Sequence, residues 1–499
     1  MKSDILFTSA NKNKYLSAPA ENYIIPASPV FSYIVEQFLK NGDNINLPDK
    51  LVIDNREYQK NQVEYYYNKF LFLKNKGVFL NKRKDEFGKL DGKQIEWQLA
   101  NVDHLVFEVT DACNLKCKYC GYGEFYTDYD ERVNKYMPFE IAREMINYLV
   151  NLWQSPLNYS QNHNVTVGFY GGEPLMNIDF IKKVIDYLEK LSIPKIHFRW
   201  SMTTNALLLG KSMDYLVEKD FSILVSLDGN EENHGYRVNH NSKNSFPDVH
   251  QNVRQLQQKY PDFFKRNVNF NSVLHNKNSV SEIFDYIKKE FGKNPSISEL
   301  SDAGIRPEKV EEFKKTYRNN YESLQQAENY EDIINESILN NPDFRELTSF
   351  AGQYSGNIFE RYTDLLSKKI KKTYLPTGTC SPFSKKVFVT VNGKILPCER
   401  IGFQHALGVV SKNGVQLDLE QIAQRINSYY NNITEQCSSC HRTQTCVQCI
   451  YYLDKLSEKP VCKGFTNEKR FSDYLARNIS YLENNPGDYK KVLEDVSIE

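Results

Sequence analysis

Between residues 103 and 275 the sequence alternates strand-like and helical segments, and this pattern limits the possible folds more than any other feature. Strands that are separated by helices form β-α-β units, and such units build a parallel sheet. The pattern therefore predicts an α/β fold with a partial (β/α)6 TIM-type barrel over residues 101–290. Its active site is expected at the carboxyl ends of the strands. The strand-like segments are HLVFEVT, VTVGFYG, IHFRWSM, FSILVSLDG and NVNFNSVLH.

The chain of 499 residues is too long to form the barrel alone. The sequence outside residues 101–290 predicts four further parts. Residues 1–100 combine short extended pieces with two helical segments, which indicates a winged-helix-like α+β domain. Residues 291–375 are mostly charged and helical in pattern, and we assign no chemistry to this connecting region. Residues 376–470 are rich in cysteine and open with a predicted β-hairpin that turns at Asn392-Gly393. Residues 471–499 predict a helix and a tail.

The charge balance narrows the classes of partner. The chain carries 63 Lys and Arg residues and 63 Asp and Glu residues, so its formal net charge is zero, and nothing indicates a nucleic-acid or membrane partner. No stretch resembles a signal peptide or approaches the ~18 consecutive apolar residues of a transmembrane helix, so the chain is expected in the cytoplasm. In that reducing compartment, ten clustered cysteines indicate metal ligands or catalytic thiols rather than disulfides.

Three cysteines in the stretch CNLKCKYC follow the first predicted strand directly. Cys113, Cys117 and Cys120 have the spacing C-x3-C-x2-C. A structural zinc site takes four protein ligands, and a cubane iron–sulfur cluster normally takes four cysteines. Three cysteines leave one iron open to a substrate or cofactor. A zinc half-site is the alternative for these three residues taken alone.

This spacing, with Tyr119 before the last cysteine, resembles the signature of the radical S-adenosylmethionine (radical SAM) enzymes. The resemblance implies that the open iron chelates S-adenosylmethionine and that electron transfer releases a 5′-deoxyadenosyl radical. It also implies cofactor contacts by the GGEP loop and by polar residues near later strand ends, although each single residue also fits a plain structural role there. These residues are Gly171, Gly172, Glu173, Pro174, Asn205, Ser226, Asp228, Arg237 and Asn271, and Tyr119 of the signature is expected to contact the cofactor as well.

Seven further cysteines resemble the SPASM domain of radical SAM enzymes that modify peptides and proteins. The resemblance implies two auxiliary [4Fe–4S] clusters, and so three clusters in the chain. Zinc sites are the alternative, because C-x2-C pairs are also a zinc-ribbon spacing. The first auxiliary cluster would use Cys380, Cys398 and Cys449, which leaves it one thiolate short. The second would use Cys437, Cys440, Cys446 and Cys462.

The stretch from SLDG to SDAGIRPEKVEEF resembles the GG-Bacteroidales group of radical SAM peptide maturases, and residues 1–100 resemble the peptide-recognition element (RRE) fused to many maturases. The resemblance implies an enzyme that binds the leader of a precursor peptide on residues 1–100. It would install a thioether or carbon–carbon crosslink, with a flavodoxin or ferredoxin as electron donor. Two alternatives stay open: a sulfatase-maturase-like oxidase of a Cys or Ser side chain, and a non-catalytic zinc or peptide-binding protein. The oxidase needs a general base, for which Glu124, Asp128 and Asp130 are candidates.

Overall fold

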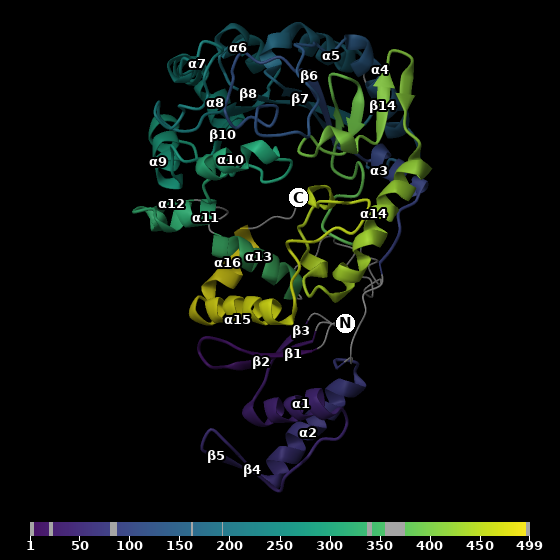
Figure 1. The fold of residues 1–499 in the computed structure, drawn as a ribbon, viewed down its shortest axis with the longest axis vertical. Helices are drawn as coiled ribbons and strands as arrows, with labels where there is room; N and C mark the ends of the chain where they lie inside the picture. Colours follow the sequence, from purple (N-terminus) through teal and green to yellow (C-terminus); the bar gives the residue numbers. More distant parts are fainter. Residues whose placement is uncertain are drawn as a thin grey trace. The chain divides into compact units, whose positions relative to one another are not determined.

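The computed structural model describes residues 4–18, 23–79, 87–160, 163–191, 193–336, 342–354 and 375–495. The chain divides into two compact units (Figure 1). The first unit combines Met1–Lys89 with two later stretches, Asn341–Thr379 and Asn427–Glu499. The second unit, called the barrel unit below, contains Leu90–Asn340 and Cys380–Ile426.

Six parallel strands form the centre of the barrel unit and confirm the predicted α/β fold. They lie in sequence order within a ten-stranded sheet, and every neighbouring pair among them is parallel. Five of them coincide with the five strand-like segments, and the sixth falls in the region expected to be helical. They are β6 (His104–Thr110), β7 (His163–Gly171), β8 (Ile196–Thr204), β9 (Ser222–Ser226), β10 (Val268–Val273) and β11 (Ser296–Ser298).

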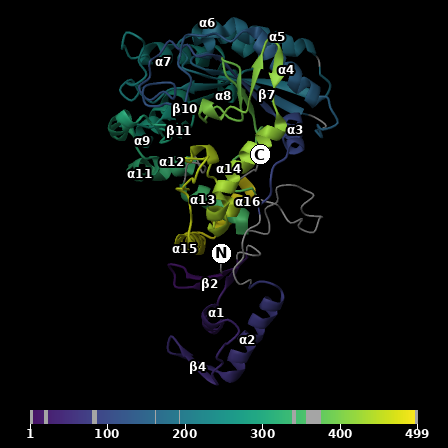
Figure 2. The same cartoon turned by 45° about the vertical axis from the view of Figure 1, so that its right-hand side comes forward.

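Amphipathic helices lie along one side of these strands in both views (Figures 1 and 2). In the helix at Ile178–Leu191, Ile181, Val184 and Leu188 are buried at intervals of three and four residues. Burial of such apolar faces, at about 25 cal/mol per Å² removed from water, holds the helices against the sheet. The α-helices that precede β11 in the barrel unit are α3 (Gly92–Ala100), α4 (Phe139–Trp153), α5 (Ile178–Leu191), α6 (Leu209–Glu218), α7 (Phe246–Lys259), α8 (Pro261–Asn267) and α9 (Val280–Phe291).

A hairpin from the cysteine-rich region extends the sheet beyond β6. Its first strand, β12 (Val387–Val389), pairs in parallel with β6 and antiparallel with β13 (Lys394–Leu396). The predicted turn is confirmed: Gly393 has φ +78°, and a Cβ there would overlap the carbonyl oxygen of Val410. The strands β14 (Gly408–Ser411) and β15 (Gly414–Gln416) complete the sheet. The first part of the predicted cysteine-rich domain therefore belongs to the barrel unit.

The first part of the expected connecting region packs against the loop that follows Cys120. Thr127 N donates to Gly304 O (3.0 Å), and Arg306 N donates to Phe125 O (2.8 Å). Aromatic and aliphatic side chains from both segments share one small apolar cluster. This part of the chain therefore packs on the cysteine loop and also connects the two predicted domains. Its helices are η2 (Pro307–Lys309), α10 (Val310–Thr316), α11 (Asn320–Gln325) and α12 (Tyr330–Glu336).

The N-terminal part of the first unit is a small α+β fold. A three-stranded antiparallel sheet precedes a helix, a two-stranded hairpin and a second helix. Ser28 caps the first helix, whose buried stripe includes Ile34 and Phe38. The winged-helix-like domain over residues 1–100 stays a prediction. The elements are β1 (Ile5–Thr8), β2 (Lys14–Ala18), β3 (Tyr23–Pro26), α1 (Pro29–Asn41), β4 (Lys50–Ile53), β5 (Arg56–Gln59) and α2 (Lys60–Asn75).

The rest of the first unit is helical and rich in loops. The helix predicted for residues 471–499 is present as α15 (Glu468–Asn484), which begins three residues earlier than expected. Its Glu483 accepts hydrogen bonds from Ser9 Oγ (3.1 Å) and Tyr15 Oη (2.7 Å). Within the described part of the chain, no helix is long and apolar enough to cross a membrane. The other helices are α13 (Pro342–Tyr354), α14 (Leu419–Ser439), η6 (Thr443–Thr445), η7 (Ile450–Tyr452) and α16 (Gly487–Asp495). The first turns of α14, up to Ile426, belong to the barrel unit.

Candidate functional site

The three cysteines of the C-x3-C-x2-C stretch lie in the loop after β6 and line one cavity of about 170 Å³, called the first cavity. Backbone hydrogen bonds shape this loop: Cys120 N donates to Cys117 O (3.2 Å), and Gly123 N donates to Cys120 O (2.7 Å). The Leu115 N–H points at Cys113 Sγ (3.4 Å). Burial raises the pKa of the Cys113 thiol to about 11, so a cation is needed before it becomes a thiolate at neutral pH.

Two glycines at the end of β7 pack closely against the backbone that leads into the cysteine loop. Gly171 has φ +126°, and a Cβ there would overlap the carbonyl oxygen of Thr110. A Cβ on Gly172 would overlap the carbonyl oxygen of Ala112, which directly precedes Cys113. The Gly172 N–H donates to Thr110 O (2.8 Å). Glycine alone permits this approach, so the predicted Gly-Gly pair forms one wall of the first cavity.

Glu173 lines the first cavity and ties the β7 loop to the end of β8. Its Oε1 accepts hydrogen bonds from Thr204 Oγ1 (2.7 Å) and Leu175 N (3.1 Å), and its Oε2 accepts one from Asn205 N (2.8 Å). Burial raises the pKa of Glu173 to about 7, although these donors favour the charged form. The side chain therefore holds two strand ends together beside the cysteines.

Three more predicted residues reach the first cavity from successive strand ends. Asn205 follows β8, Ser226 ends β9, and Arg237 comes from the loop after β9. The Asn205 Nδ2 donates to Asn114 Oδ1 (2.7 Å) and lies 3.7 Å from Cys113 Sγ. The structure therefore brings these polar groups and the cysteines to the carboxyl end of the parallel sheet, where the sequence places them.

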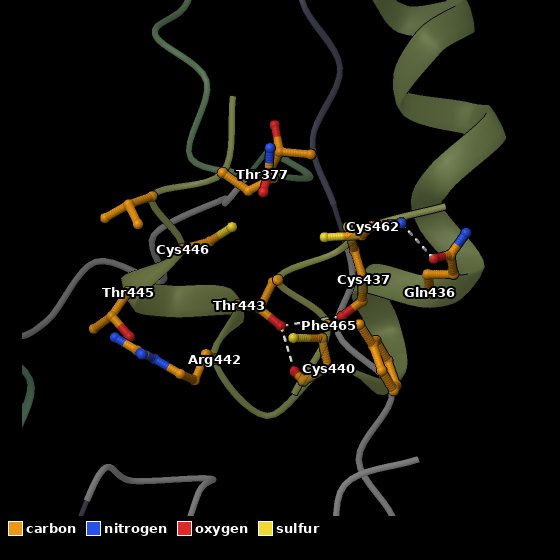
Figure 3. Close-up of a pocket in the computed structure, with 13 residues that line it drawn as sticks. Thr377, Gln436, Cys437, Cys440, Arg442, Thr443, Thr445, Cys446, Cys462 and Phe465 are labelled. Atoms are coloured by element: carbon orange, nitrogen blue, oxygen red, sulfur yellow. Dashed lines mark hydrogen bonds between the residues drawn. The ribbon is translucent and has the colours of Figure 1, made fainter. Parts of the chain in front are cut away.

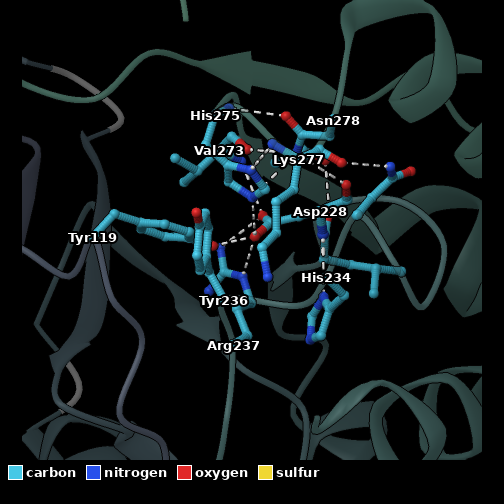
Figure 4. Close-up of polar contacts among 12 residues, drawn as sticks. Tyr119, Asp228, His234, Tyr236, Arg237, Val273, His275, Lys277 and Asn278 are labelled. Atoms are coloured by element: carbon cyan, nitrogen blue, oxygen red, sulfur yellow. Dashed lines mark hydrogen bonds and ion pairs between the residues drawn. The ribbon is translucent and has the colours of Figure 1, made fainter. Parts of the chain in front are cut away.

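Asp228 is fully buried and organises a polar network instead of lining the cavity (Figure 4). Its two oxygens accept hydrogen bonds from Arg237 Nε and Nη2 (3.0 Å each), and Oδ1 also accepts from Val273 N (2.9 Å). Tyr119 Oη donates to Oδ2, and His275 Nε2 lies 3.7 Å from the same oxygen. Burial opposes ionisation here, but the Arg237 charge keeps the pKa of Asp228 well below its usual range. Asp228 thus orients Arg237 and Tyr119.

The predicted cofactor residues that do not line the first cavity hold structural positions nearby. Pro174 is buried at the start of η1 (Pro174–Asn177). Asn271 accepts a hydrogen bond at Oδ1 from Ser298 Oγ (3.1 Å) on the neighbouring strand β11. Tyr119 and Asp228 belong to the network of Figure 4.

Three tyrosines form a further wall of the first cavity, and the sequence patterns assign them no role. Tyr122 and Tyr129 come from the loop after Cys120, and Tyr170 comes from β7. The ring centroids of Tyr122 and Tyr129 are 4.9 Å apart, and Tyr129 packs on Phe403 at 5.1 Å. These aromatic rings give the cavity apolar surface in addition to its polar groups.

Glu399 is the second carboxyl group that lines the first cavity, and it is the functional candidate that the sequence analysis missed. Lys386 Nζ lies 3.0 and 2.9 Å from its two oxygens. Although burial opposes ionisation, this ammonium lowers the pKa of Glu399. Its one sequence signal is its position directly after Cys398. The carboxylates named as candidates lie in the loop after Cys120, and none of them lines this cavity: Glu124, Asp128 and Asp130.

Four later cysteines line a second cavity, of about 150 Å³, within the first unit (Figure 3). They come from the last turns of α14 and the loops after it. Thr443 Oγ1 lies within hydrogen-bond distance of Cys437 O (3.0 Å) and Cys440 O (2.6 Å). Burial raises the pKa of the Cys437 thiol to about 12. The set is the one expected for the second auxiliary cluster: Cys437, Cys440, Cys446 and Cys462.

The remaining three cysteines are divided between the two units. Cys380 and Cys398 belong to the barrel unit, and Cys449 belongs to the first unit. Cys380 is exposed, and Cys398 Sγ receives the Arg400 N–H (3.4 Å). Their assignment to one auxiliary cluster stays a prediction. Across the described residues, no three His, Cys, Asp or Glu side chains are placed to hold a single metal ion; seven of the cysteines line the two cavities instead.

Residues 107–289 match the sequence profile of the radical SAM superfamily. This range contains the three cysteines, the Gly-Gly pair and the strand ends that line the first cavity. The barrel unit contains a radical SAM domain. The resemblance drawn from the cysteine spacing is therefore confirmed at the level of the superfamily.

Two curated relatives and one solved structure extend the comparison of this radical SAM domain. The chain is 27% identical over 197 residues to a cysteine-type anaerobic sulfatase-maturating enzyme of Clostridium novyi, covering 38% of this chain and about half (49%) of the relative. It is 24% identical over 366 residues to the radical SAM cyclopropyl synthase TigE of Paramaledivibacter caminithermalis, covering 70% of this chain and 67% of the relative. The structure of histidine-tagged anSMEcpe with bound AdoMet shares the fold, with a TM-score of 0.50, 18% identity and coverage of 79% of this chain and 95% of that one.

The radical SAM domain implies a [4Fe–4S] cluster and S-adenosylmethionine, and the residues of the first cavity fit both. Three thiols supply three iron ligands, and the other walls carry the glycine backbone and the polar groups of Asn205 and Ser226. A wider cavity of about 700 Å³ shares the same three cysteines and Tyr122. The site therefore combines an incomplete thiolate set with space for a further ligand beside it.

Proposed function

We propose that this protein is a radical SAM enzyme that modifies a ribosomally synthesised precursor peptide by forming a thioether or carbon–carbon crosslink between side chains. The first cavity carries the proposal: three cysteines face a close-packed glycine pair, polar strand ends and an ionised carboxylate. In this mechanism, removal of hydrogen from an unactivated carbon uses an iron site with an open position and a pocket for the cofactor. A crosslink also needs a proton acceptor.

In this proposal the three cysteines of the first cavity ligate a [4Fe–4S] cluster. The cluster and S-adenosylmethionine, when bound, supply a 5′-deoxyadenosyl radical that takes a hydrogen atom from the substrate. The glycine pair lets the backbone approach the methionine end of the cofactor. Asn205 and Ser226 offer hydrogen bonds to its polar groups. Arg237, held by Asp228, pairs with a carboxylate, for which its planar guanidinium is suited.

Glu399 is the proton acceptor in this proposal. When a carbon radical joins a thiol, the new carbon–sulfur bond forms with loss of one proton and one electron. Glu399 receives the proton because Lys386 keeps its carboxylate ionised next to the cysteines. The four cysteines of the second cavity would hold an auxiliary cluster that receives the electron, and Cys380, Cys398 and Cys449 would hold a third cluster.

A peptide substrate is supported by the relatives, since one is named as a sulfatase-maturating enzyme and so acts on a protein. In our proposal, residues 1–100 bind the leader of the precursor as an RRE-like domain. The reaction needs a low-potential donor such as a flavodoxin or ferredoxin, and the balanced charge of the chain gives no sign of a nucleic-acid or membrane partner. A cytoplasmic location, as expected from the sequence, is part of the same proposal.

The test uses protein that is purified without oxygen and reconstituted with iron and sulfide. We expect iron and sulfide in equal amounts, negligible zinc, and formation of 5′-deoxyadenosine from S-adenosylmethionine and dithionite. A pool of synthetic peptides that each contain one cysteine is then added, and mass spectrometry is expected to find products that have lost two hydrogens. Bound zinc with negligible iron would contradict the proposal and favour the zinc-binding alternative.

A second candidate function is oxidation of a Cys or Ser side chain to an aldehyde, which the 27% identity to a sulfatase-maturating enzyme favours. The same peptide assay separates the two functions. A thioether crosslink keeps the sulfur of the peptide and loses two hydrogens, whereas an aldehyde made from cysteine has lost its sulfur.

A further inference from the structure

Two arginines lie beside the cysteines of the first cavity, and they differ in how their charge is matched. Arg237 is buried, and Asp228 accepts hydrogen bonds from its Nε and Nη2. Arg132 has no such partner among the described residues. Its Nη2 lies 3.6 Å from Cys120 Sγ, and its Nε is buried without a hydrogen bond. Arg132 is therefore a guanidinium with an unused N–H beside a predicted iron ligand.

The neighbouring side chains hold the guanidinium group of Arg132 in place but balance its positive charge only in part. Its guanidinium carbon lies 4.4 Å from the ring centroid of Tyr122, which lines both cavities that the three cysteines share. The positive charge of Arg132 interacts with the carboxyl group of Glu108. Glu108 is buried and accepts a hydrogen bond from Val391 N (2.9 Å). Burial raises the pKa of Glu108 to about 7, so this carboxyl matches the charge of Arg132 only in part near neutral pH.

We propose that Arg132 donates hydrogen bonds to sulfur atoms of the cluster held by the first three cysteines and thereby raises its reduction potential. This inference rests on the proposed function, which places a cluster there. An external one-electron reductant adds one electron, and Arg132 stabilises the added negative charge through its N–H groups and its positive charge. Arg132 keeps its proton throughout, because guanidinium stays charged in proteins.

Three full-length variants test this role. Arg132→Gln removes the charge and the fork of donors, and Arg132→Lys keeps only the charge. Arg306→Gln is the matched control: Arg306 lines the same 700 Å³ cavity, but it has no hydrogen bond to a cysteine sulfur in the described part of the chain. Iron content is measured for each reconstituted protein. The electron paramagnetic resonance signal that changes on addition of S-adenosylmethionine, which marks the iron with an open position, is followed in a redox titration.

We expect equal iron content in wild type and all variants. In Arg132→Gln the midpoint potential should fall by about 59 mV, which is a tenfold change in the ratio of reduced to oxidised cluster for one electron. The fall should be smaller in Arg132→Lys and absent in Arg306→Gln.

An unchanged potential in Arg132→Gln would overturn the inference. An equal fall in Arg306→Gln would also overturn it, because the charge of the cavity as a whole would then explain the shift. Loss of iron confined to the Arg132 variants would show a purely structural role and overturn it as well. Wild-type protein without iron would instead contradict the proposed function, so the two failures are distinguishable.

Discussion

The two cysteine cavities have similar volumes, about 170 and 150 Å³, but different walls. The first lies at the edge of a parallel sheet, and strand ends far apart in the sequence supply its glycines, amides and carboxylates. The second is built by four cysteines from the end of α14 and the loops after it, and neither Asp nor Glu is among its described lining residues. One cavity combines three thiols with two carboxyl groups, whereas the described lining of the other combines four thiols with Thr, Gln and Arg side chains.

In the proposed function the two cavities hold different kinds of iron site, and the residues around the thiols distinguish them. Four thiolates can occupy every outer iron position of a cubane, which suits electron transfer. Three thiolates leave one position for a ligand, and the Gly-Gly pair and Asn205 line the same cavity as the three cysteines. The proposed function therefore gives substrate chemistry to the first cavity and electron storage to the second. The predictions below test this assignment.

Loss of a single cysteine is expected to separate the two cavities most sharply. Cys117→Ala should lower the iron content by roughly four atoms per chain and abolish cleavage of S-adenosylmethionine. Cys440→Ala should lower the iron content by a similar amount and keep cleavage in the absence of peptide. An iron assay and chromatography of 5′-deoxyadenosine measure both. Cleavage that is lost in Cys440→Ala and kept in Cys117→Ala would reverse our assignment.

Glu399→Gln tests the ionised carboxylate of the first cavity, a group that the described lining of the second cavity lacks. Peptide modification should fall by about 10²–10⁴-fold, the usual contribution of general acid–base catalysis, while cleavage of S-adenosylmethionine without peptide stays within about twofold of wild type. Glu124→Gln is the control, because Glu124 lines the wider cavity and pairs with Lys116 (3.5 Å) and Lys309 (3.3 Å). Equal losses in both variants would remove the special role of Glu399.

The pH profile gives a second readout for the same carboxylate. Lys386 lowers the pKa of Glu399, so modification should be lost only as the pH falls through that lowered value. Lys386→Met removes the ammonium, and the acid limb of the profile should then move to higher pH. An unmoved acid limb would show that another group accepts the proton.

The sequence predicts the parts of the barrel unit that depend on local pattern. Five strands follow from alternating segments, and the cysteine loop and glycine pair follow from their motifs. The strand β11 has three residues, and its pairing with β10 defines it, so local composition cannot reveal it. Glu399 reaches the first cavity from a segment far along the chain. Asp228 fits a cofactor motif, but in the folded chain it is buried and binds Arg237, so it orients that side chain instead of lining the cavity.

Beside each cavity, a glycine packs closely against the backbone of a segment that contains the cysteines. The two glycines allow a paired test. A Cβ on Gly172 would overlap Ala112 O, and a Cβ on Gly378 would overlap Cys446 O. Each Ala substitution should cost about 3 kcal/mol of stability, at the upper end for overpacking. Gly172→Ala should impair cleavage of S-adenosylmethionine, whereas Gly378→Ala should lower iron and spare cleavage. In Gly487→Ala, where a Cβ meets no atom within 4 Å, neither should change.

The smallest expected effect concerns Glu108, a buried carboxyl of β6 behind the first cavity. Burial raises its pKa from 4.5 to about 7, so the folded state favours the protonated form. The stability that this preference gives is fully present below the unfolded-state pKa and is lost as the pH rises through the folded-state pKa. Glu108→Gln keeps an acceptor for the Val391 N–H and cannot ionise.

Metal-free Glu108→Gln should therefore become more stable relative to wild type by about 2 kcal/mol between about pH 5 and about pH 8. Urea unfolding at the two pH values measures this difference. Glu173 stays in both proteins, so its own raised pKa cancels from the comparison. A constant difference between variant and wild type would show that Glu108 is already charged in the folded state. Its carboxylate would then match Arg132, and the contrast between the two arginines at the first cavity would disappear.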